Sequence, residues 1–269
     1  MADLEAKKGM FIDTSVCIGC KACETACKEW NELPMNPNYG FSGQSYDNTQ
    51  KLNGENWRHV KFIEDFSEDR SETRWLFLSD SCKHCQQAGC MEVCPTNAII
   101  RTEYDTVYID PDVCIGCKYC VTGCPFGVID ISMVTGTARK CTLCYDRLQV
   151  GKQPACAQAC PTDCIEFGDV DELMAKAKER EQQLRANGES RAQIYGDSNI
   201  LGGLNVFYLL MDEPGKYGLP ANPQLPQKNM VGGYWSSVLS FIGIGLVSLL
   251  SFRTRGLRKQ QEEKSDISQ

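Results

Sequence analysis

Apolar and polar residues alternate only over short runs along most of this chain, and such runs are typical of short β-strands. Two neighbouring runs predict a strand pair, and two more predict a small hairpin around a polar turn. Further single strands are predicted near the middle of the chain and after residue 200. The predicted strand segments are Trp57–Phe66 with Thr73–Leu78, Ala98–Arg101 with Val107–Asp110, Gly127–Met133 and Val206–Met211.

One stretch has the signals of a helix instead. Asp169 followed by Glu172 is typical of a capping box at a helix N-terminus. We expect the helix to run to about Ala186 and to stop at Gly188, because glycine is favoured just past a helix end. Its apolar stripe is thin and consists of Leu173, Ala177 and Leu184.

The segment Val231–Phe252 differs from the rest of the chain because its 22 residues carry no charge. As a helix it spans about 33 Å, which is enough to cross the hydrocarbon core of a bilayer. Tyr234 and Trp235 lie at its start, where an interfacial aromatic belt is expected. A buried core helix is the alternative, but such a helix is rarely uncharged for so long. Two other segments lack periodicity: 31–56 is predicted to be loop, and the proline-rich 212–229 an extended arm.

Cysteine is the most informative residue type, with 17 in the chain. Sixteen of them form four groups, of which the first and third read C-x2-C-x2-C-x3-C, the run that bacterial ferredoxins use for [4Fe–4S] clusters. The second and fourth groups lengthen the middle gap. The groups are Cys17, Cys20, Cys23, Cys27; Cys82, Cys85, Cys90, Cys94; Cys114, Cys117, Cys120, Cys124; and Cys141, Cys144, Cys156, Cys160. Four thiolates per cluster predict four [4Fe–4S] clusters and a protein that transfers electrons.

In such two-cluster units the fourth cysteine of a run ligates the other cluster. Groups two and three, with the hairpin between them, form one unit, and groups one and four form a second. This exchange predicts four ligand sets, which we name A to D. They are Cys17, Cys20, Cys23, Cys160 for A; Cys141, Cys144, Cys156, Cys27 for B; Cys82, Cys85, Cys90, Cys124 for C; and Cys114, Cys117, Cys120, Cys94 for D.

Two other uses of these cysteines have to be weighed. Eight disulfides would suit a short secreted chain, but closely spaced cysteines on tight loops pair poorly with one another. Group four alone resembles a Cys₄ zinc site, and a zinc-stabilised, membrane-tethered interaction module is the alternative function class. Metal analysis separates the interpretations, because four clusters require about sixteen iron and sixteen acid-labile sulfide per chain, against about four zinc.

The remaining candidate residues predict little independent chemistry. Cys164 follows the last group and is expected to be a free, buried cysteine. The chain has only 2 histidines, so a haem held by a histidine pair is not expected, and His84 is predicted to be solvated at the surface. No P-loop, dinucleotide-binding turn or Ser–His–Asp set is present, so the chain is not expected to be an enzyme by itself. Cations near the groups could raise cluster potentials or face a partner; they are Lys21, Lys83, Lys118, Arg139 and Lys140.

Charge and targeting signals bear on partners and location. The formal net charge is −7, and four clusters with their thiolates add roughly −8, so nucleic acid is not an expected partner. Positive residues after the apolar segment predict a cytoplasmic C-terminus; they are Arg253, Arg255, Arg258 and Lys259. The cluster domain would then face the periplasm or outside of a bacterial inner (cell) membrane. The start of the chain has no apolar stretch, so we expect export together with a partner that carries the signal.

The cysteine groups and their surroundings resemble the four-cluster electron-transfer subunits of molybdopterin oxidoreductases over residues 10–170. The resemblance is carried by FIDTSVCIGCKACETACKEWN, CKHCQQAGCMEVCPTNAI, CIGCKYCVTGCPF and RKCTLCYDRLQVGKQPACAQACPT. The downstream string IYGDSNILGGLNVFYLLMDEPGKYGLPANP, followed by one apolar segment, is similar to the beta (iron–sulfur) subunit of membrane-bound respiratory formate dehydrogenase. Some relatives have a tryptophan in place of one cysteine of group three. This chain differs from them, because its Cys114, Cys117 and Cys120 are all present.

The resemblance implies partners that the spacing alone does not indicate. A catalytic subunit with a molybdenum or tungsten bis-pterin cofactor would oxidise formate and carry a twin-arginine export signal. A membrane cytochrome b subunit would pass the electrons to quinone in anaerobic respiration. The pattern of cluster ligation in this family also agrees with the predicted exchange of fourth cysteines. An equivalent subunit of another molybdopterin oxidoreductase, or of a membrane-bound hydrogenase, is the alternative.

The predicted fold class is α+β, with two interleaved 2[4Fe–4S] ferredoxin-like units and one C-terminal transmembrane α-helix. The predicted segments are a four-cluster domain at 1–168, a helix, strand and extended arm at 169–229, a transmembrane helix at 230–253 and a cytoplasmic tail at 254–269.

Overall fold

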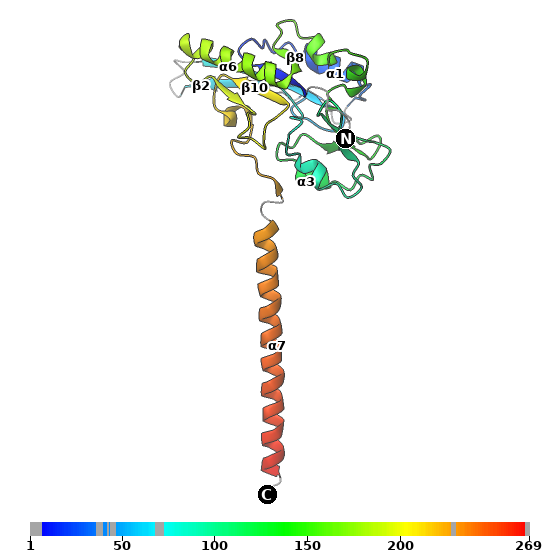
Figure 1. Cartoon of the computed structure of the whole chain (residues 1–269), viewed down its shortest axis with the longest axis vertical. Coiled ribbons are helices and arrows are strands. Elements are labelled where there is room, and N and C mark those ends of the chain that lie inside the picture. The colour runs from blue at the N-terminus through cyan, green and yellow to red at the C-terminus, as the bar shows by residue number, and fades with distance from the viewer. Residues whose placement is uncertain are drawn as a thin grey trace. The chain divides into compact units, whose positions relative to one another are not determined.

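The computed structural model describes residues 7–35, 40–41, 43, 47–67, 73–226 and 230–266 (Figure 1). Parts of the predicted loop 31–56, of the arm 212–229 and of the tail 254–269 therefore lie outside the described residues. The protein divides into two compact units, and the boundary falls between Leu225 and Pro226. The first unit contains all the cysteines, and the second contains the apolar segment.

A four-stranded sheet organises the first unit and joins distant parts of the chain. Its strand order is β8 (Ile165–Asp169), β1 (Lys8–Asp13), β10 (Val206–Leu210) and β9 (Gln193–Tyr195). The central strands β1 and β10 run parallel and are almost entirely buried, and the rings of Phe11 and Phe207 stack at 5.6 Å between centroids. Parallel pairing with no hairpin turn requires a long crossover, which here contains all four cysteine groups.

The helix predicted after residue 168 is confirmed as α6 (Val170–Ala186). It buries the thin stripe of Leu173, Ala177 and Leu184 and packs on β1 and β8. Gly188 follows the helix with a φ of 99°, a conformation that glycine adopts without strain. The strand predicted at Val206–Met211 is likewise confirmed as β10.

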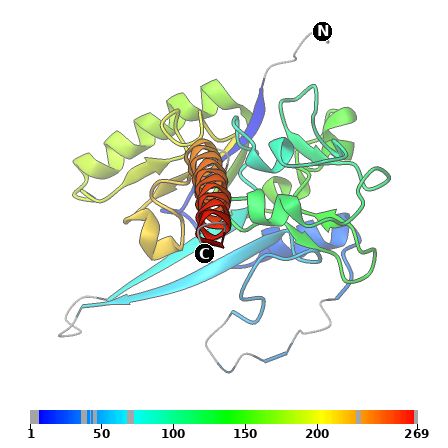
Figure 2. The ribbon, with the colours of Figure 1, turned by 90° about the horizontal axis from the view of Figure 1, so that it is seen from below.

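Three two-stranded hairpins complete the strands of the first unit. They are β2 (Arg58–Phe66) with β3 (Thr73–Ser81), β4 (Ile99–Arg101) with β5 (Val107–Ile109), and β6 (Asp130–Ile131) with β7 (Ala138–Arg139). The first two pairs confirm the predictions, and Figure 2 shows β2–β3 (cyan) reaching out from the body of the unit. The strand predicted at Gly127–Met133 shrinks to two residues, because Gly127 has a φ of 62° and the chain turns back at Ser132.

Five short helices carry or directly follow cysteines. They are α1 (Ala22–Trp30), α2 (Gly89–Glu92), α3 (Tyr119–Gly123), α4 (Tyr145–Gln149) and α5 (Ala155–Gln158), and a 3₁₀ turn, η1 (Pro214–Tyr217), lies further on. Two separate apolar cores support them. The larger surrounds the four-stranded sheet and includes Cys23 and Cys156, whereas the smaller surrounds β4–β5 and includes Cys90 and Cys120.

The second unit is the helix α7 (Met230–Asp266). Its stretch Gly233–Gly256 is long and apolar enough to cross a membrane, by length and composition, and it is not buried within the structure. The exposed side chains along it include Trp235, Leu239 and Phe241. The fold class predicted from the sequence is confirmed in its mixed helices and strands and in its C-terminal apolar helix.

Candidate cluster-binding site

The first predicted ligand set converges on one small cavity. Cys17, Cys20 and Cys23 come from the loop before α1 and from its first turn, and Cys160 comes from the distant end of group four. All four line a cavity of about 20 Å³, together with Cys164. The structure thus places the fourth cysteine of group four beside the first three of group one.

The other three sets are also drawn together across the sequence. In each set the pKa of one thiol is raised, mainly by burial and further by repulsion from neighbouring cysteines. That repulsion identifies which cysteines lie near it. These neighbours are Cys141, Cys156 and Cys144 for Cys27; Cys82, Cys124 and Cys90 for Cys85; and Cys114, Cys117 and Cys94 for Cys120. In each case the three cysteines of one group approach the fourth cysteine of another. The two-unit ligand exchange stays a prediction, and this placement of the thiols agrees with it.

The loops between the cysteines have a backbone suited to anionic sulfur. Lys21, Lys118, His84 and Leu143 have positive φ angles of 60°, 67°, 46° and 57°. Left-handed residues in such turns point successive N–H groups to one side, which forms a cradle for anions. Backbone N–H groups lie near sulfur accordingly, with His84 N 3.5 Å from Cys82 Sγ and Leu143 N 3.4 Å from Cys141 Sγ.

Burial makes several of these thiols poor acids in the absence of a bound cation. It raises the pKa of Cys141 to about 11 and that of Cys144 to about 12. It also raises the pKa of Cys90 to about 12, although the ammonium of Lys140 opposes the rise. Thiolates are the ligating form, so iron at these positions would displace protons and compensate the buried negative charge.

Cys164 is buried, as predicted, with 2% of its surface exposed. It is not isolated, because it lines the same small cavity as Cys17 and Cys160. Its thiol is the main cause that lowers the pKa of Cys160 to about 5. A fifth sulfur therefore borders set A, and its single S–H proton is available to one of the neighbouring predicted ligands.

The prediction that His84 is solvated is wrong, because its side chain is fully buried. The backbone N–H of Val107 donates to its Nδ1 at 3.0 Å, so the ring proton resides on Nε2. Burial lowers the pKa of His84 well below its usual value, which keeps the ring neutral. The residue pattern gave no signal for this, since β4–β5 covers the loop only in the folded chain.

Two buried polar atoms in this region have no protein partner among the described residues. They are His84 Nε2 and Arg58 Nε. Buried donors are almost always satisfied, so such orphans indicate a missing acceptor. Converging cysteines, inward-facing amides and orphaned donors fit an anionic iron–sulfur group.

The cations that the sequence places near the cysteine groups differ in burial. Lys118 is exposed, whereas Lys83 is buried and forms an ion pair with Asp80, whose carboxylate also binds Lys61 at 3.0 Å. Lys140 is buried and donates to the carbonyl oxygens of Val107 and Cys141. Burying an ammonium requires compensation, and the carboxylate and carbonyl oxygens supply it here.

Arg58 and Ser79 are functional candidates that the sequence analysis missed. Arg58 opens β2 with 1% of its surface exposed, and its Nη1 donates to Ser79 Oγ at 2.9 Å. Ser79 Oγ lies in turn 3.2 Å from Cys23 Sγ. Burial lowers the pKa of Arg58, but neighbouring thiolates outweigh it and raise that pKa; these are Cys156, Cys23, Cys141 and Cys27. Arginine in a half-polar strand carries no sequence signal of burial.

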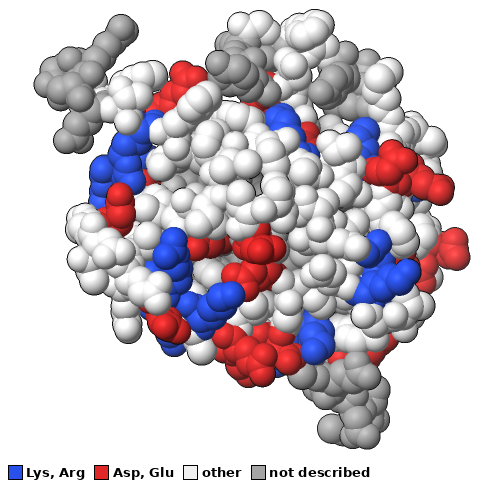
Figure 3. Space-filling view, turned by 90° about the horizontal axis from the view of Figure 1, so that it is seen from above, with Lys and Arg blue, Asp and Glu red and all other residues white. Residues whose placement is uncertain are grey.

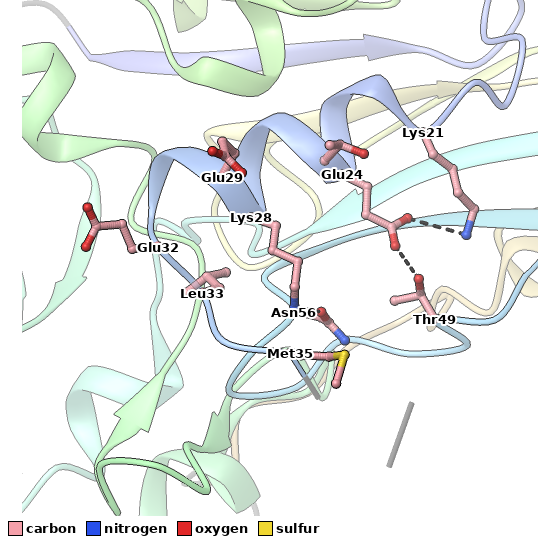
Figure 4. A pocket seen from close by; sticks show the side chains of 10 residues that line it. Lys21, Glu24, Lys28, Glu29, Glu32, Leu33, Met35, Thr49 and Asn56 are labelled. Carbon is pink, nitrogen blue, oxygen red and sulfur yellow. Dashed lines mark hydrogen bonds and ion pairs between the residues drawn. The ribbon is translucent and has the colours of Figure 1, made fainter. Parts of the chain in front are cut away.

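A separate cavity of about 520 Å³ lies along α1 and has no cysteine in its lining (Figure 4). Glu24 is central in it: its carboxylate accepts from the hydroxyl of Thr49 and pairs with Lys21 at 3.6 Å. It also accepts the backbone N–H of Val60 in β2 at 3.1 Å. These contacts fix α1 against β2 and so hold Cys23 near Ser79.

The surface has mixed charge on the face shown in Figure 3, where Lys and Arg are interspersed with Asp and Glu. Among the described residues, no group of three or more His, Cys, Asp or Glu is arranged to hold a single metal ion. The ligands of a four-iron cluster bind four different iron atoms and therefore stand further apart. All 17 cysteines are free of disulfides.

Comparison with known proteins agrees with this chemistry. Two family models match, each described as a 4Fe–4S dicluster domain, at residues 16–98 and 73–170. The fold and site are thus those of an iron–sulfur electron-transfer protein with two ferredoxin-like dicluster domains, which provide for four [4Fe–4S] clusters.

Similar proteins place the chain more narrowly within the class of iron–sulfur electron-transfer proteins. The nitrate-inducible formate dehydrogenase iron–sulfur subunit of Escherichia coli is 39% identical over 227 residues, covering 83% of this chain and 76% of the relative. The formate dehydrogenase-O iron–sulfur subunit of the same organism is 35% identical over 274 residues, covering 98% and 89%. The B component of anaerobic dimethyl sulfoxide reductase, also from E. coli, is 39% identical over 172 residues, covering 62% and 76%. The chain therefore belongs to the family of formate dehydrogenase iron–sulfur subunits, which are electron-transfer rather than catalytic subunits.

Proposed function

We propose that this chain connects a molybdopterin catalytic subunit, containing molybdenum or tungsten and oxidising formate, to a membrane cytochrome b subunit that reduces quinone. When bound, four [4Fe–4S] clusters supply one-electron redox chemistry, which the side chains of the protein lack. The ligand sets are those named A to D. Relatives over nearly the whole chain length support the assignment to formate oxidation.

One observation carries the proposal: the three cysteines of group one share a cavity with Cys160, the last cysteine of group four. More than 130 residues separate these positions, so local spacing does not explain their meeting. The exchange of fourth cysteines between groups requires this meeting, whereas four independent Cys₄ sites would not. The neighbours of Cys27, Cys85 and Cys120 support the same pattern for the other sets.

The residues of the chain have three tasks in this function. Cysteine thiolates bind iron, and the left-handed turns direct N–H groups toward sulfur, as at Cys82 and Cys141. Eight of the sixteen predicted ligand cysteines are buried, which excludes water from their sulfurs. Hydrogen bonding and burial are the means by which a protein sets cluster potentials, so these tasks also tune the electron path.

We place the chain in a bacterial inner membrane through one pass of α7, with the cluster domain on the periplasmic or outer face. Arg253 and Arg255 lie at the C-terminal end of the candidate span Gly233–Gly256, and the excess of positive charge at this end supports a cytoplasmic C-terminus. Protease treatment of vesicles of known sidedness tests this. Digestion of the cluster domain from the cytoplasmic face alone would overturn the orientation.

Isolation of the intact membrane complex under anaerobic conditions tests the function. We expect a pterin-containing catalytic subunit and a haem b subunit to co-purify, with electron transfer from formate to an artificial dye. A nickel-containing partner would instead indicate a hydrogenase. The likeness to the dimethyl sulfoxide reductase component favours a different molybdopterin partner as the second candidate, but it covers only 62% of the chain. A complex that reduces dimethyl sulfoxide and ignores formate would select that candidate.

A further inference from the structure

Arg58 is a buried cation whose direct partners are all neutral. Its Nη1 donates to Ser79 Oγ at 2.9 Å, and its Nη2 lies 3.2 Å from Ser81 Oγ and 3.4 Å from Met10 Sδ. None of the ion pairs formed by the described residues involves Arg58. A guanidinium remains charged at any physiological pH, so this positive charge needs a compensating negative charge nearby.

The cysteines of two ligand sets provide the nearest candidates for that negative charge. Ser79 links the guanidinium to Cys23 of set A, since its Oγ lies 3.2 Å from Cys23 Sγ. The other cysteines that act on Arg58 belong to set B and come from groups one and four. They are Cys27, Cys141 and Cys156. Arg58, the first residue of β2, therefore lies near the cysteines of both set A and set B, which belong to the unit formed by groups one and four.

Arg58 is held differently from two other buried cations, although Lys140 likewise has no anionic partner among the described residues. Lys83 has the carboxylate of Asp80, and Lys140 has two backbone carbonyl oxygens. Arg58 has two hydroxyls, a thioether and an unpaired Nε. Its charge is left for the sulfurs of sets A and B to balance.

We infer that Arg58 is a positioning residue that serves as the shared counter-ion of clusters A and B and favours the reduced state of both. The inference rests on the proposed cluster function and on the ligand sets. Each reduction adds one electron, and the added negative charge is stabilised by a fixed positive charge in a medium of low dielectric constant. Loss of that charge therefore lowers the reduction potential of the nearby clusters.

The test is an anaerobic redox titration of the intact complex, followed by electron paramagnetic resonance, for wild type, Arg58→Gln and Arg58→Lys. We expect Arg58→Gln to lower two of the four midpoint potentials. At a fixed potential, the ratio of reduced to oxidised cluster should fall at least about tenfold for these two, which is about 59 mV for a one-electron couple. Arg58→Lys should restore most of the shift because it keeps the charge.

Arg74→Gln is the matched control, since Arg74 pairs with the carboxylates of Asp212 and Glu189 rather than with cysteines. It should leave all four potentials unchanged. The inference is overturned if Arg58→Gln leaves all potentials in place, shifts all four equally, or is not rescued by lysine. Iron and sulfide content of the wild type is measured in parallel, so failure of the cluster function itself is recognised separately.

Removal of a buried charge can prevent accumulation of the complex, and a milder variant then decides. Ser79→Ala leaves Arg58 in place but removes the hydroxyl that connects it to Cys23. One potential, that of cluster A, should then fall while that of cluster B is retained. Unchanged potentials in Ser79→Ala would contradict the role of Arg58 if Arg58→Gln cannot be isolated.

Discussion

Groups one and three begin with the same five residues, Cys-Ile-Gly-Cys-Lys, and differ in almost everything that surrounds them. Their backbones agree, with φ angles of 66° at Gly19 and 67° at Gly116. In group one, Lys21 pairs with Asp47 at 3.3 Å and lies over the ring of Phe62, whereas Lys118 of group three is exposed.

The burial of the two groups differs in the same sense. The first three cysteines of the two groups match in burial, but at the fourth position Cys27 is buried whereas Cys124 is only half-buried. The short motif thus determines the loop, while distant segments determine its dielectric environment and neighbouring charges. Equal cysteine runs are therefore expected to hold clusters of unequal potential and unequal access to solvent.

The largest contrast is expected from removal of a ligand in each group. Cys27→Ala and Cys124→Ala, at the fourth position of each group, should each lower the iron and sulfide content of the isolated complex. Cys27→Ala should in addition destabilise the domain by about 1.5 kcal/mol more than Cys124→Ala, because the sulfur of Cys27 is buried and its loss leaves a void. Denaturant unfolding under anaerobic conditions measures the difference, and equal losses of stability would contradict the contrast.

The shared glycine provides a subtler comparison. Alanine at either position costs about 1–2 kcal/mol, because both glycines are left-handed. A Cβ at Gly19 would meet the rings of Phe77 at 2.8 Å and Phe62 at 3.0 Å, which can shift, but a Cβ at Gly116 would clash with the carbonyl oxygen of Gly136.

Gly116→Ala should therefore be the more destabilising of the two, by about 1 kcal/mol, because relief requires movement of the backbone between β6 and β7. Thermal unfolding of the two variants checks the order. A larger loss in Gly19→Ala would show that the aromatic pair is the more rigid support.

Groups four and two differ in the residue that stands four positions after their last cysteine. It is Cys164 after group four and Ala98 after group two. Cys164→Ala removes the S–H donor beside Cys17 and Cys160 without removing a predicted ligand. We expect unchanged iron content and a lower potential for cluster A alone, by an amount on the order of 1 kcal/mol, the value of one hydrogen bond. Redox titration measures the shift; a missing cluster would instead identify Cys164 as a ligand.

The smallest effect is expected at the two lysines. Lys21→Gln breaks partly exposed ion pairs with Asp47 and Glu24 and should cost ~0.5 kcal/mol. Lys118→Gln should change the stability by less than this, since its side chain is exposed. Urea midpoints of the two variants provide the measurement, and a larger loss for Lys118→Gln would reverse the comparison.

Elements with local signals were predictable from the sequence. The hairpins β2–β3 and β4–β5, the helix α6 and the uncharged part of α7 each follow from patterns of residues close together in the chain, although Asp169 makes no side-chain cap hydrogen bond to α6. The four-stranded sheet was not predictable in this way, because its central pairing joins Met10 to Val206 and neither strand's sequence specifies its partner. Long-range pairing of this kind depends on the whole fold rather than on propensity.

The candidate site divides in the same way. Spacing identified the sixteen cysteines and the rule of exchange, because ligand geometry is local to each run. The burial of His84 and Arg58 was not predictable, since β4–β5 and the turns of group four cover them only after folding. Which cysteines share a cluster stays a prediction.

Diffraction from crystals of the intact complex at the iron absorption edge shows which cysteines enclose each cluster, because it locates iron independently of the polypeptide. We expect four compact groups of iron in this protein, one of them enclosed by Cys17, Cys20, Cys23 and Cys160. Four groups of iron that are each enclosed by the cysteines of a single run, or single zinc atoms in their place, would contradict this expectation.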